Sequence, residues 1–384
     1  MLRKILPNSE KQEATDQNLV NCLRIIRSSN IGSVTFKNLL KMFGSYTEVI
    51  KQAPELAKKA GSKKPFIIAE ESQILEEIEN TYKYGAEFIT IDNSNYPDLL
   101  KQIHDAPPVL IVKGDKSLLK QESLGIVGSR NASLNGIAIT KKIAKEVGSK
   151  GYVITSGLAR GIDSSAHEGS LESGTIAVIA GGINHIYPPE NAKLYEKISQ
   201  EGLVITEGAF NYSPLARNFP QRNRIISGLS KAILVVEAST KSGSLITATT
   251  AIDQGREVMA IPGFPMDPRC QGPNKLIKEG AYLVESIEDL ISYLQNLPSK
   301  SLILNDNDQK DFLRPTNFSD IDTEEVRSIV LSSLSFTPIL LDDIVKQFDI
   351  PISLLYLAIL ELELSGKILR YGPDKFVLNI EAHE

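Results

Sequence analysis

Basic residues stand in two stretches of this sequence from which carboxylates are missing. No acid occurs between Glu207 and Glu237, and this gap holds Arg217, Arg222, Arg224 and Lys231. A second acid-free window, residues 123–145, holds Arg130, Lys141, Lys142 and Lys145. The whole chain has a formal net charge of −5, so this excess of positive charge is local. Cations gathered away from carboxylates are suited to an anionic ligand.

Three turns rich in glycine and serine supply further donors for an anion. The turns LGIVGSRNAS, ITSGLARGIDSS and EASTKSGSLITA each follow an apolar run and carry one cation: Arg130, Arg160 and Lys241. Amide groups at the starts of helices attract anions, so each turn is a predicted phosphate site. For any one turn an ordinary solvated loop is an equally good interpretation, but three turns on one sheet edge favour function. The motifs GxxxxGK(S/T) and GxGxxG are absent, which disfavours a Walker-type NTPase and NAD binding.

The spread of these cations favours a polymeric ligand. Cations on several loops suit a polyanion better than a mononucleotide, because each neutralised phosphate adds affinity through counterion release. Phe219 lies among the arginines and could stack on an unpaired base, a contact of ~1–3 kcal/mol; a core anchor for the loop is an equally good interpretation. The hypothesis requires Arg130, Arg217, Arg222 and Arg224 to converge on one carboxylate-poor trough at the sheet edge.

Seven short β-branched runs alternate with segments of helical length from Leu124 onward. The runs are residues 124–129, 152–157, 175–182, 203–208, 232–239, 257–263 and 281–284. Such alternation is typical of α/β units, and it predicts a doubly wound, mostly parallel, Rossmann-like sheet with helices on both faces. Residues 88–92 and 109–115 are candidates for additional edge strands.

Helical and polar segments flank the predicted sheet domain. We predict a small helical domain over residues 1–75, the sheet domain over 80–295, a polar linker over 296–319, and a winged helix over 320–384.

The two end domains differ in charge. Residues 319–384 carry five basic and twelve acidic residues, a balance of 5 − 12 = −7. A winged helix that grips duplex DNA presents a basic face, so this one is predicted to make a protein contact or an autoinhibitory contact. Residues 16–61 carry seven basic and three acidic residues, a balance of 7 − 3 = +4, which could extend a DNA surface; a solvated helix face is the simpler interpretation.

Other kinds of chemistry lack support. Cys22 and Cys270 belong to no CxxC motif, and the four histidines show no HxH or HExxH spacing, so we expect no disulfide framework, metal or cofactor. No apolar run reaches membrane-spanning length, and the first sixteen residues lack the apolar core of a secretory signal. We therefore expect a cytoplasmic protein without membrane insertion.

Five motifs give the chain a specific resemblance. They are GSR (128–130), SGLARGID (156–163), FPQRNRIISGLS (219–230), VVEASTKSGSLITA (235–248) and AIPG (260–263). Together they resemble the DprA (Smf) family of DNA-processing proteins over about residues 80–295. The flanking segments fit that family's frequent layout, with an N-terminal domain like a sterile alpha motif or a helix-hairpin-helix and a C-terminal winged helix.

The resemblance implies an extended Rossmann-like domain that binds single-stranded DNA and is not an enzyme. It also implies that the protein protects incoming or processed strands and helps to load the RecA recombinase in natural transformation (competence) and recombination, usually as a homodimer. The predicted DNA-binding residues, from the turns and the family motifs together, are Gly128, Ser129, Arg130, Arg160, Arg217, Phe219, Arg222, Asn223, Arg224 and Lys241.

Two other functions remain open on the sequence. A nucleotide-processing enzyme similar to the lysine-decarboxylase-like phosphoribohydrolases would need a general acid or base, for which Asp163, Glu207 and Glu237 are the candidates. The PGGxGTxxE signature of that group is absent, and partners for arginines or helix caps are the commoner roles for such carboxylates. A protein-contact scaffold is the third possibility, and it leaves the exposed positive charge unexplained.

Overall fold

The structure, a computed structural model, describes residues 10–61, 66–297, 320–348, 350–372 and 374–379. Its chain forms two compact units: one from residues 1–76 and 303–384, the other from residues 77–302. The linker predicted over 296–319 falls almost wholly outside the described residues. None of the described helices is long and apolar enough to cross a membrane.

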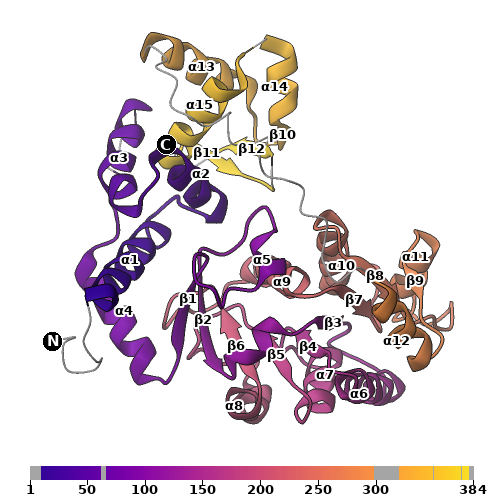
Figure 1. Cartoon of the computed structure of the whole chain (residues 1–384). Coiled ribbons are helices and arrows are strands. Elements are labelled where there is room, and N and C mark those ends of the chain that lie inside the picture. The colour runs from indigo at the N-terminus through magenta and orange to yellow at the C-terminus, as the bar shows by residue number, and fades with distance from the viewer. Residues whose placement is uncertain (1–9, 62–65, 298–319, 349, 373, 380–384) are drawn as a thin grey trace. The chain divides into compact units, whose positions relative to one another are not determined.

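A nine-stranded sheet forms the centre of the second unit, in the order β1-β2-β6-β5-β4-β3-β7-β8-β9 (Figure 1). The strands are β1 (Glu87–Thr90), β2 (Val109–Gly114), β3 (Ser123–Val127), β4 (Val153–Ser156), β5 (Thr175–Val178), β6 (Leu203–Thr206), β7 (Ala232–Val235), β8 (Glu257–Ala260) and β9 (Tyr282–Leu283). Strands β3 to β9 pair in parallel, while β1 and β2 pair antiparallel at one edge. The seven predicted runs and both edge candidates are therefore all strands, and the predicted fold class is confirmed.

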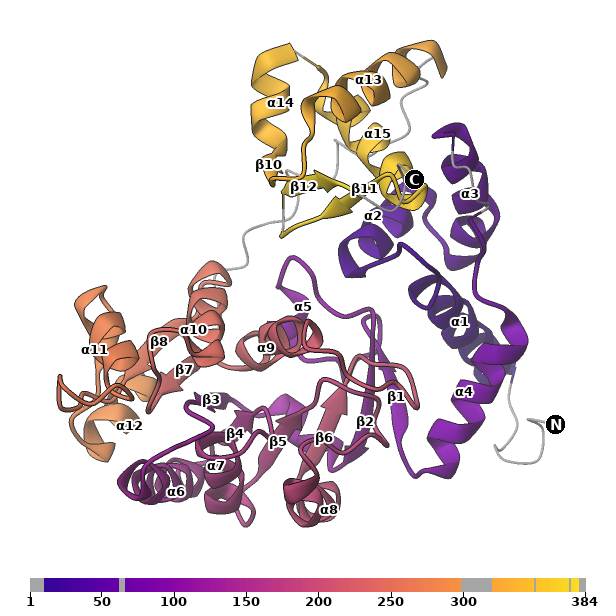
Figure 2. The ribbon, with the colours of Figure 1, turned by 180° about the vertical axis from the view of Figure 1, so that it is seen from behind.

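Helices cover both faces of this sheet (Figures 1 and 2). One face carries α5 (Asp98–Lys101), α9 (Asn218–Leu229), α10 (Gly243–Asp253) and α11 (Gln271–Lys278). The other carries α6 (Leu134–Ser149), α7 (Ile162–Ser170), α8 (Ala192–Glu201) and α12 (Ile287–Asn296). Short 3-10 turns, η2 (Lys116–Lys120) and η3 (Pro189–Asn191), complete the connections. The order of the strands reverses between β3 and β7, so loops from several strands gather at one edge, as they do in ligand-binding α/β folds.

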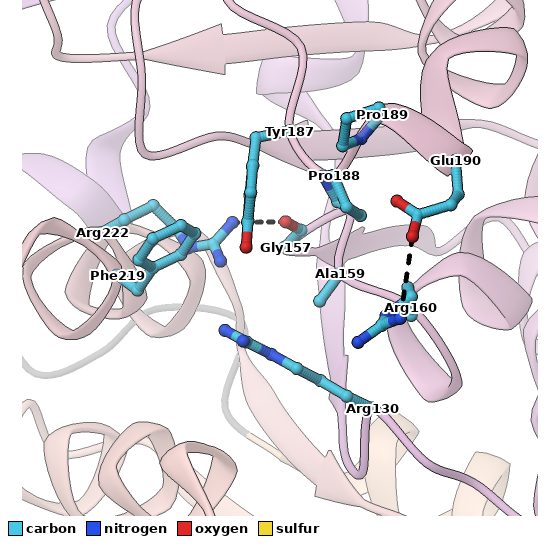
Figure 3. A pocket seen from close by; sticks show the side chains of 10 residues that line it. All are labelled: Arg130, Gly157, Ala159, Arg160, Tyr187, Pro188, Pro189, Glu190, Phe219 and Arg222. Atoms are coloured by element: carbon cyan, nitrogen blue, oxygen red, sulfur yellow. Dashed lines mark hydrogen bonds and ion pairs between the residues drawn. The ribbon is translucent and has the colours of Figure 1, made fainter. Parts of the chain in front are cut away.

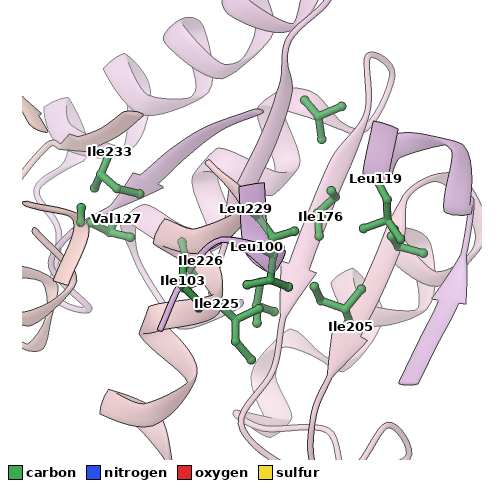
Figure 4. Close-up of a cluster of buried hydrophobic side chains, with 14 of the residues drawn as sticks. Leu100, Ile103, Leu119, Val127, Ile176, Ile205, Ile225, Ile226, Leu229 and Ile233 are labelled. Atoms are coloured by element: carbon green, nitrogen blue, oxygen red, sulfur yellow. The ribbon is translucent and has the colours of Figure 1, made fainter. Parts of the chain in front are cut away.

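The largest apolar core lies between the sheet and the helices of the first face (Figure 4). Helix α9 places Ile225, Ile226 and Leu229 in this core, where they meet Leu100 and Ile103 from the α5 region. Each of the three α9 side chains is at most 5 % exposed. Burial of an apolar side chain stabilises the fold by about 1.5–3 kcal/mol, so α9 is firmly held.

The first unit combines the two ends of the chain. Its N-terminal part contains α1 (Glu10–Ile26), α2 (Ser33–Phe43) and α3 (Tyr46–Lys59), followed by α4 (Glu71–Lys83), which continues into the second unit. Its C-terminal part contains α13 (Asp320–Ser333), β10 (Ile339–Leu340), α14 (Leu341–Phe348), α15 (Ile352–Leu364), β11 (Ile368–Arg370) and β12 (Lys375–Leu378). The three strands form one antiparallel sheet in the order β10-β12-β11, so this part has the predicted winged-helix order.

Candidate nucleic-acid interface

A pocket of about 160 Å³ opens beyond the carboxyl ends of β3, β4, β5 and β6 (Figure 3). Residues from four different loops or helix starts line it. They are Arg130, Gly157, Ala159, Arg160, Tyr187, Pro188, Pro189, Glu190, Phe219 and Arg222. Six of the ten predicted DNA-binding residues do not line this pocket: Gly128, Ser129, Arg217, Asn223, Arg224 and Lys241.

Arg130 lies together with two aromatic rings in the pocket. The Arg130 guanidinium carbon lies 5.5 Å from the centre of the Phe219 ring, within cation–π range. The Tyr187 ring lies 5.4 Å from the Phe219 ring at an interplanar angle of 57°. Tyr187 is 46 % exposed, and Arg130 is exposed and forms no ion pair among the described residues. A cation without an ion pair, beside one exposed ring and one partly exposed ring, can take both a phosphate and a base.

The loops after β3 and β4 are locked to each other, which fixes the backbone at Arg130. The Ile162 amide donates to the Ser129 carbonyl at 3.2 Å. Gly161 has φ +77°, and a Cβ there would lie 2.3 Å from the same carbonyl oxygen. A Cβ on Gly128 would lie 2.5 Å from Ile162 and 2.9 Å from the Glu237 carbonyl oxygen. Gly128 and Ser129 therefore have packing roles in this structure, and they support the pocket from behind.

Arg222 lines the pocket but is only 6 % exposed. Its guanidinium donates to the carbonyls of Gly157 and Val178, and its Nε donates to Asn223 at 3.3 Å. Burial lowers the pKa of Arg222 to about 10, against the opposing charge of Asp163, so the guanidinium stays charged at neutral pH. Arg222 thus ties the ends of β4 and β5 to α9 and adds positive potential at the base of the pocket.

Arg224 is not one of the pocket's cations, which corrects the expected convergence of four arginines. Its side chain, 12 % exposed, forms ion pairs with Asp105 at 3.2 Å and with Glu207 at 2.5 Å. A cation between two carboxylates has little potential left for a phosphate. Residues 222 and 224 are about 200° apart around a helix, so they cannot face the same way.

The remaining predicted cations are exposed but differ in their surroundings. Arg160 lines the pocket and pairs with Glu190 at 3.7 Å, with both side chains more than half exposed. Arg217 is exposed at the N-cap of α9, and Lys241 is exposed in the loop before α10. The Asn223 side-chain amide donates to the Gly243 carbonyl at 3.4 Å, which ties α9 to that loop.

After the three glycine turns, side chains of this chain cap the starts of α6 and α10, whereas Gly161 at the start of α7 has no side-chain cap. At α6, Glu237 accepts hydrogen bonds from the Ser133 amide at 2.9 Å and from its hydroxyl at 2.5 Å. At α7, the buried Asp163 carboxylate accepts from the Ala159 amide at 3.4 Å. At α10, the Ser242 hydroxyl caps the Ser244 amide. At α6 and α10 these caps engage amides that a phosphate would otherwise use, contrary to the prediction of open phosphate sites there.

The three carboxylates considered for catalysis all have structural partners. Glu207 is paired with Arg224, and Glu237 caps α6. Burial raises the pKa of Asp163, and the nearby Arg222 opposes this rise. None of the three lines the pocket. The described residues also contain no cluster of His, Cys, Asp or Glu that could hold a metal ion.

Six pocket residues were not predicted from the sequence: Gly157 and Ala159 in the loop after β4, and residues 187–190 after β5. Tyr187 and Glu190 belong to the segment IYPPEN, which follows β5 and leads into α8. The predicted parallel sheet already placed the end of this run at the same edge as the three glycine turns. An aromatic residue there was a usable signal, but it lay outside both acid-free windows.

Three family descriptions match this chain in order. Residues 87–295 match DNA recombination-mediator protein A, residues 16–80 match a DprA-like N-terminal HHH domain, and residues 314–372 match a DprA winged helix domain. The first match alone spans more than half of the chain.

Curated relatives and solved structures agree with these matches. DNA processing protein DprA of Bacillus subtilis is 45 % identical over 221 residues, covering 57 % of this chain and 73 % of that protein. Protein Smf of Escherichia coli is 44 % identical over 210 residues, which cover 54 % of this chain and 56 % of that protein. The X-ray structure of DNA processing protein A from Streptococcus pneumoniae aligns with a TM-score of 0.62 at 33 % identity, covering 71 % of this chain and 96 % of that one. The structure of DNA processing protein A from Helicobacter pylori, described for its single-stranded DNA binding mode, aligns with a TM-score of 0.51 at 29 % identity. The alignment covers 54 % of this chain and 96 % of that one.

Proposed function

We propose that this chain, which belongs to the DNA recombination-mediator protein A family, binds single-stranded DNA at the pocket formed by Arg130, Tyr187 and Phe219. Its relatives are DNA processing proteins, and the Helicobacter pylori relative is described as binding single-stranded DNA. In this proposal a phosphate pairs with Arg130, and one or two bases stack on the ring pair. Arg160 and Arg222 add positive potential, and the exposed Arg217 and Lys241 extend the path of the backbone.

The observation that carries the proposal is the position of Arg130 over Phe219, which pairs with the exposed Tyr187. The Arg130–Phe219 and Phe219–Tyr187 distances of 5.5 and 5.4 Å join one cation and two rings into a single surface. Stacking on such rings needs a base whose face is free, whereas the bases of a duplex are already stacked on each other. The arrangement therefore favours a single strand over a duplex and tolerates any base.

A non-enzymatic role agrees with the placement of the carboxylates. Glu190, the carboxylate in the pocket, is paired with Arg160, and Asp163, Glu207 and Glu237 are engaged elsewhere. General acid–base catalysis needs a titratable group within hydrogen-bond reach of the reacting atom. Hydrolysis of a nucleoside monophosphate by the purified protein would restore the phosphoribohydrolase alternative.

We extend the proposal to the handing of the bound strand to a RecA-type recombinase, with the protein acting as a homodimer. The support is the family description as a recombination mediator. The test is recombinase-dependent ATP hydrolysis on a strand already coated with a single-strand-binding protein. Addition of this protein should shorten the lag, and an unchanged lag would remove this part of the proposal alone.

The central experiment is a fluorescence anisotropy titration of the purified full chain on an oligothymidine strand and on a duplex of equal length. Salt is varied from about 50 to 200 mM, because each phosphate contact to a single strand adds about 0.7 to the slope of log affinity against log salt. We expect tighter binding to the strand, with a negative slope of log affinity against log salt. Equal binding to strand and duplex would overturn the proposed selectivity, and absence of strand binding would overturn the function.

A further inference from the structure

The helix that reads DNA in a winged-helix domain is α15 here, and the C-terminal half of this helix is covered on both sides. Such a helix normally lies in the major groove, with polar and basic side chains facing the bases. The sequence of α15, ISLLYLAILELEL, contains no Lys or Arg. Every residue of its C-terminal half, from Ala358 to Leu364, is buried. Its N-terminal half is partly exposed, with Ile352 41 % exposed, but carries only apolar and neutral side chains, so α15 has no basic face for a DNA groove.

One side of α15 belongs to the winged-helix core. Leu354, Leu355, Ala358, Ile359 and Leu362 all lie in the apolar cluster of that domain. The two acids on the helix are satisfied within the same domain. Glu361 pairs with Arg327 and Glu363 pairs with Arg370, and both glutamate side chains are at most 6 % exposed. These charges are therefore matched locally and do not explain why the opposite side of the helix is buried.

The other side of α15 packs against the N-terminal helices. Leu360 and Leu364, one helical turn apart, lie outside the winged-helix cluster and are only 2 % and 1 % exposed. Helix α15 contacts α3 and α2 within the same compact unit. Two polar contacts mark the edge of this surface. The Asn30 side chain donates to the Leu364 carbonyl at 3.3 Å, and the Lys367 ammonium donates to the Ala60 carbonyl at 2.6 Å.

The charges of the two domains also match each other. Residues 16–61 carry 7 − 3 = +4, and residues 319–384 carry 5 − 12 = −7. Opposite net charges favour association and suppress contacts between like domains. The contact thus combines buried leucines at its centre with polar contacts at its edge and complementary net charge, the usual composition of a specific protein interface.

We propose that the winged helix of this protein is not a reader of duplex DNA, and that α15 is instead the docking surface for the N-terminal helical domain of the same chain. The C-terminal half of the helix that other winged helices place in the major groove is used here to join the two ends of the chain into one folded unit. Opening this interface exposes Leu360 and Leu364 and frees Lys367 at its edge, but α15 itself still has no Lys or Arg with which to read DNA.

Cross-linking of the unmodified full chain tests the docking. The Lys367 ammonium contacts the carbonyl of Ala60, and Lys58 and Lys59 directly precede Ala60 in the sequence. Both lysines are therefore within reach of Lys367 for a short amine-reactive cross-linker. A mixture of unlabelled and ¹⁵N-labelled protein distinguishes links within a chain from links between chains. We expect links from Lys367 to Lys58 or Lys59 with no mixed isotope pairs. Absence of these links, or links found only between chains, would overturn the proposal.

Hydrogen exchange on full-chain variants tests the interface residues. Leu364→Asp should increase amide exchange in α2 and α3 by about tenfold or more, because it opens their contact with α15. Leu369→Asp is the matched control, since Leu369 is 47 % exposed on the wing of the same domain. If Leu364→Asp also unfolds the winged helix, Asn30→Gly serves instead, because glycine removes the edge contact and tolerates the φ of +61° at this position. Unchanged amide exchange in α2 and α3 in both variants would overturn the docking. A gain of duplex binding in either variant would overturn the proposal that the winged helix does not read duplex DNA. Neither outcome depends on strand binding at the Arg130 pocket.

Discussion

The guanidinium of Arg130 lies over the ring of Phe219, with 5.5 Å between the guanidinium carbon and the ring centre. These residues are 89 positions apart, and they meet because the loop after β3 and the start of α9 lie at the same edge of the sheet. Tyr187, after β5, adds a second ring 5.4 Å from the first. The proposed strand-binding surface is therefore a product of sheet topology.

Arg130→Ala should weaken binding to all single strands alike. Loss of one phosphate contact should reduce the steepness of the salt dependence by about 0.7 in the log–log plot. Lys142→Ala is the matched control, because Lys142 is an exposed cation on α6 that does not line the pocket. Anisotropy titrations over a salt series measure the strand affinity and its salt dependence for both variants. The same salt slope in the Arg130 variant and the wild type would contradict the phosphate role.

Tyr187→Ala and Phe219→Ala should each weaken strand binding by about 1–3 kcal/mol. Neither should change the slope of log affinity against log salt. Tyr187→Phe keeps the ring and should bind like the wild type. An oligonucleotide with abasic sites is the control ligand, since stacking needs a base. If the alanine variants lose as much affinity for the abasic strand, the rings do not act by stacking.

Arg224→Met should reduce stability and spare strand binding. It leaves Asp105 and Glu207 without their shared cation, and loss of charged hydrogen bonds costs about 1.5–3 kcal/mol. Urea unfolding followed by circular dichroism measures the first effect, and anisotropy under native conditions measures the second. Unchanged stability together with weaker strand binding would return Arg224 to the interface.

Gly161→Ala should disturb both the fold and the pocket. Its Cβ would approach the Ser129 carbonyl oxygen to 2.3 Å at φ +77°, next to the loop that holds Arg130. We expect a loss of about 1–3 kcal/mol of stability and weaker strand binding. Gly151→Ala is the control, because Gly151 has φ +90° but open space around it. Similar strand affinities for the two variants would mean that contact between the loops does not position Arg130.

His167 should make the fold less stable as the pH falls below neutral. Burial, together with the charge of Arg222, lowers the pKa of His167 from 6.5 to about 3. The unfolded chain takes up this proton below pH 6.5 and the folded chain does not, so the stabilisation is complete above pH 6.5 and is lost toward pH 3. Between pH 7.5 and 5 the loss should be about 2 kcal/mol.

The comparison that isolates this effect is urea unfolding of the wild type and His167→Gln at the same pH values. Glutamine can keep a hydrogen bond to Thr175, which the His167 ring contacts at 2.7 Å. The wild type should lose stability faster than the variant over this pH range. Parallel pH profiles would show that His167 is not the titrating group.

Sequence patterns predicted the sheet because strand formation depends on local alternation and on glycine turns. All nine apolar runs became strands, and the loops after β3 and β4, with Phe219 at the start of α9, supplied pocket residues as expected. The helical N-terminal domain and the winged helix were also recognisable from their order of elements. These features are encoded over short spans of chain, so a single sequence contains the signal.

The tertiary structure decided which charges meet. Arg222 and Arg224 are two residues apart, yet one is buried at the base of the pocket and the other pairs with Asp105 and Glu207. An acid-free window of sequence does not exclude carboxylates from space, and Glu190 enters the pocket from a different loop. Helix rotation turns neighbouring side chains in different directions, and folding brings partners from distant segments. The sequence thus determined the scaffold and the residue types at its edge, whereas only the folded chain determined which cations keep their charge available to a ligand.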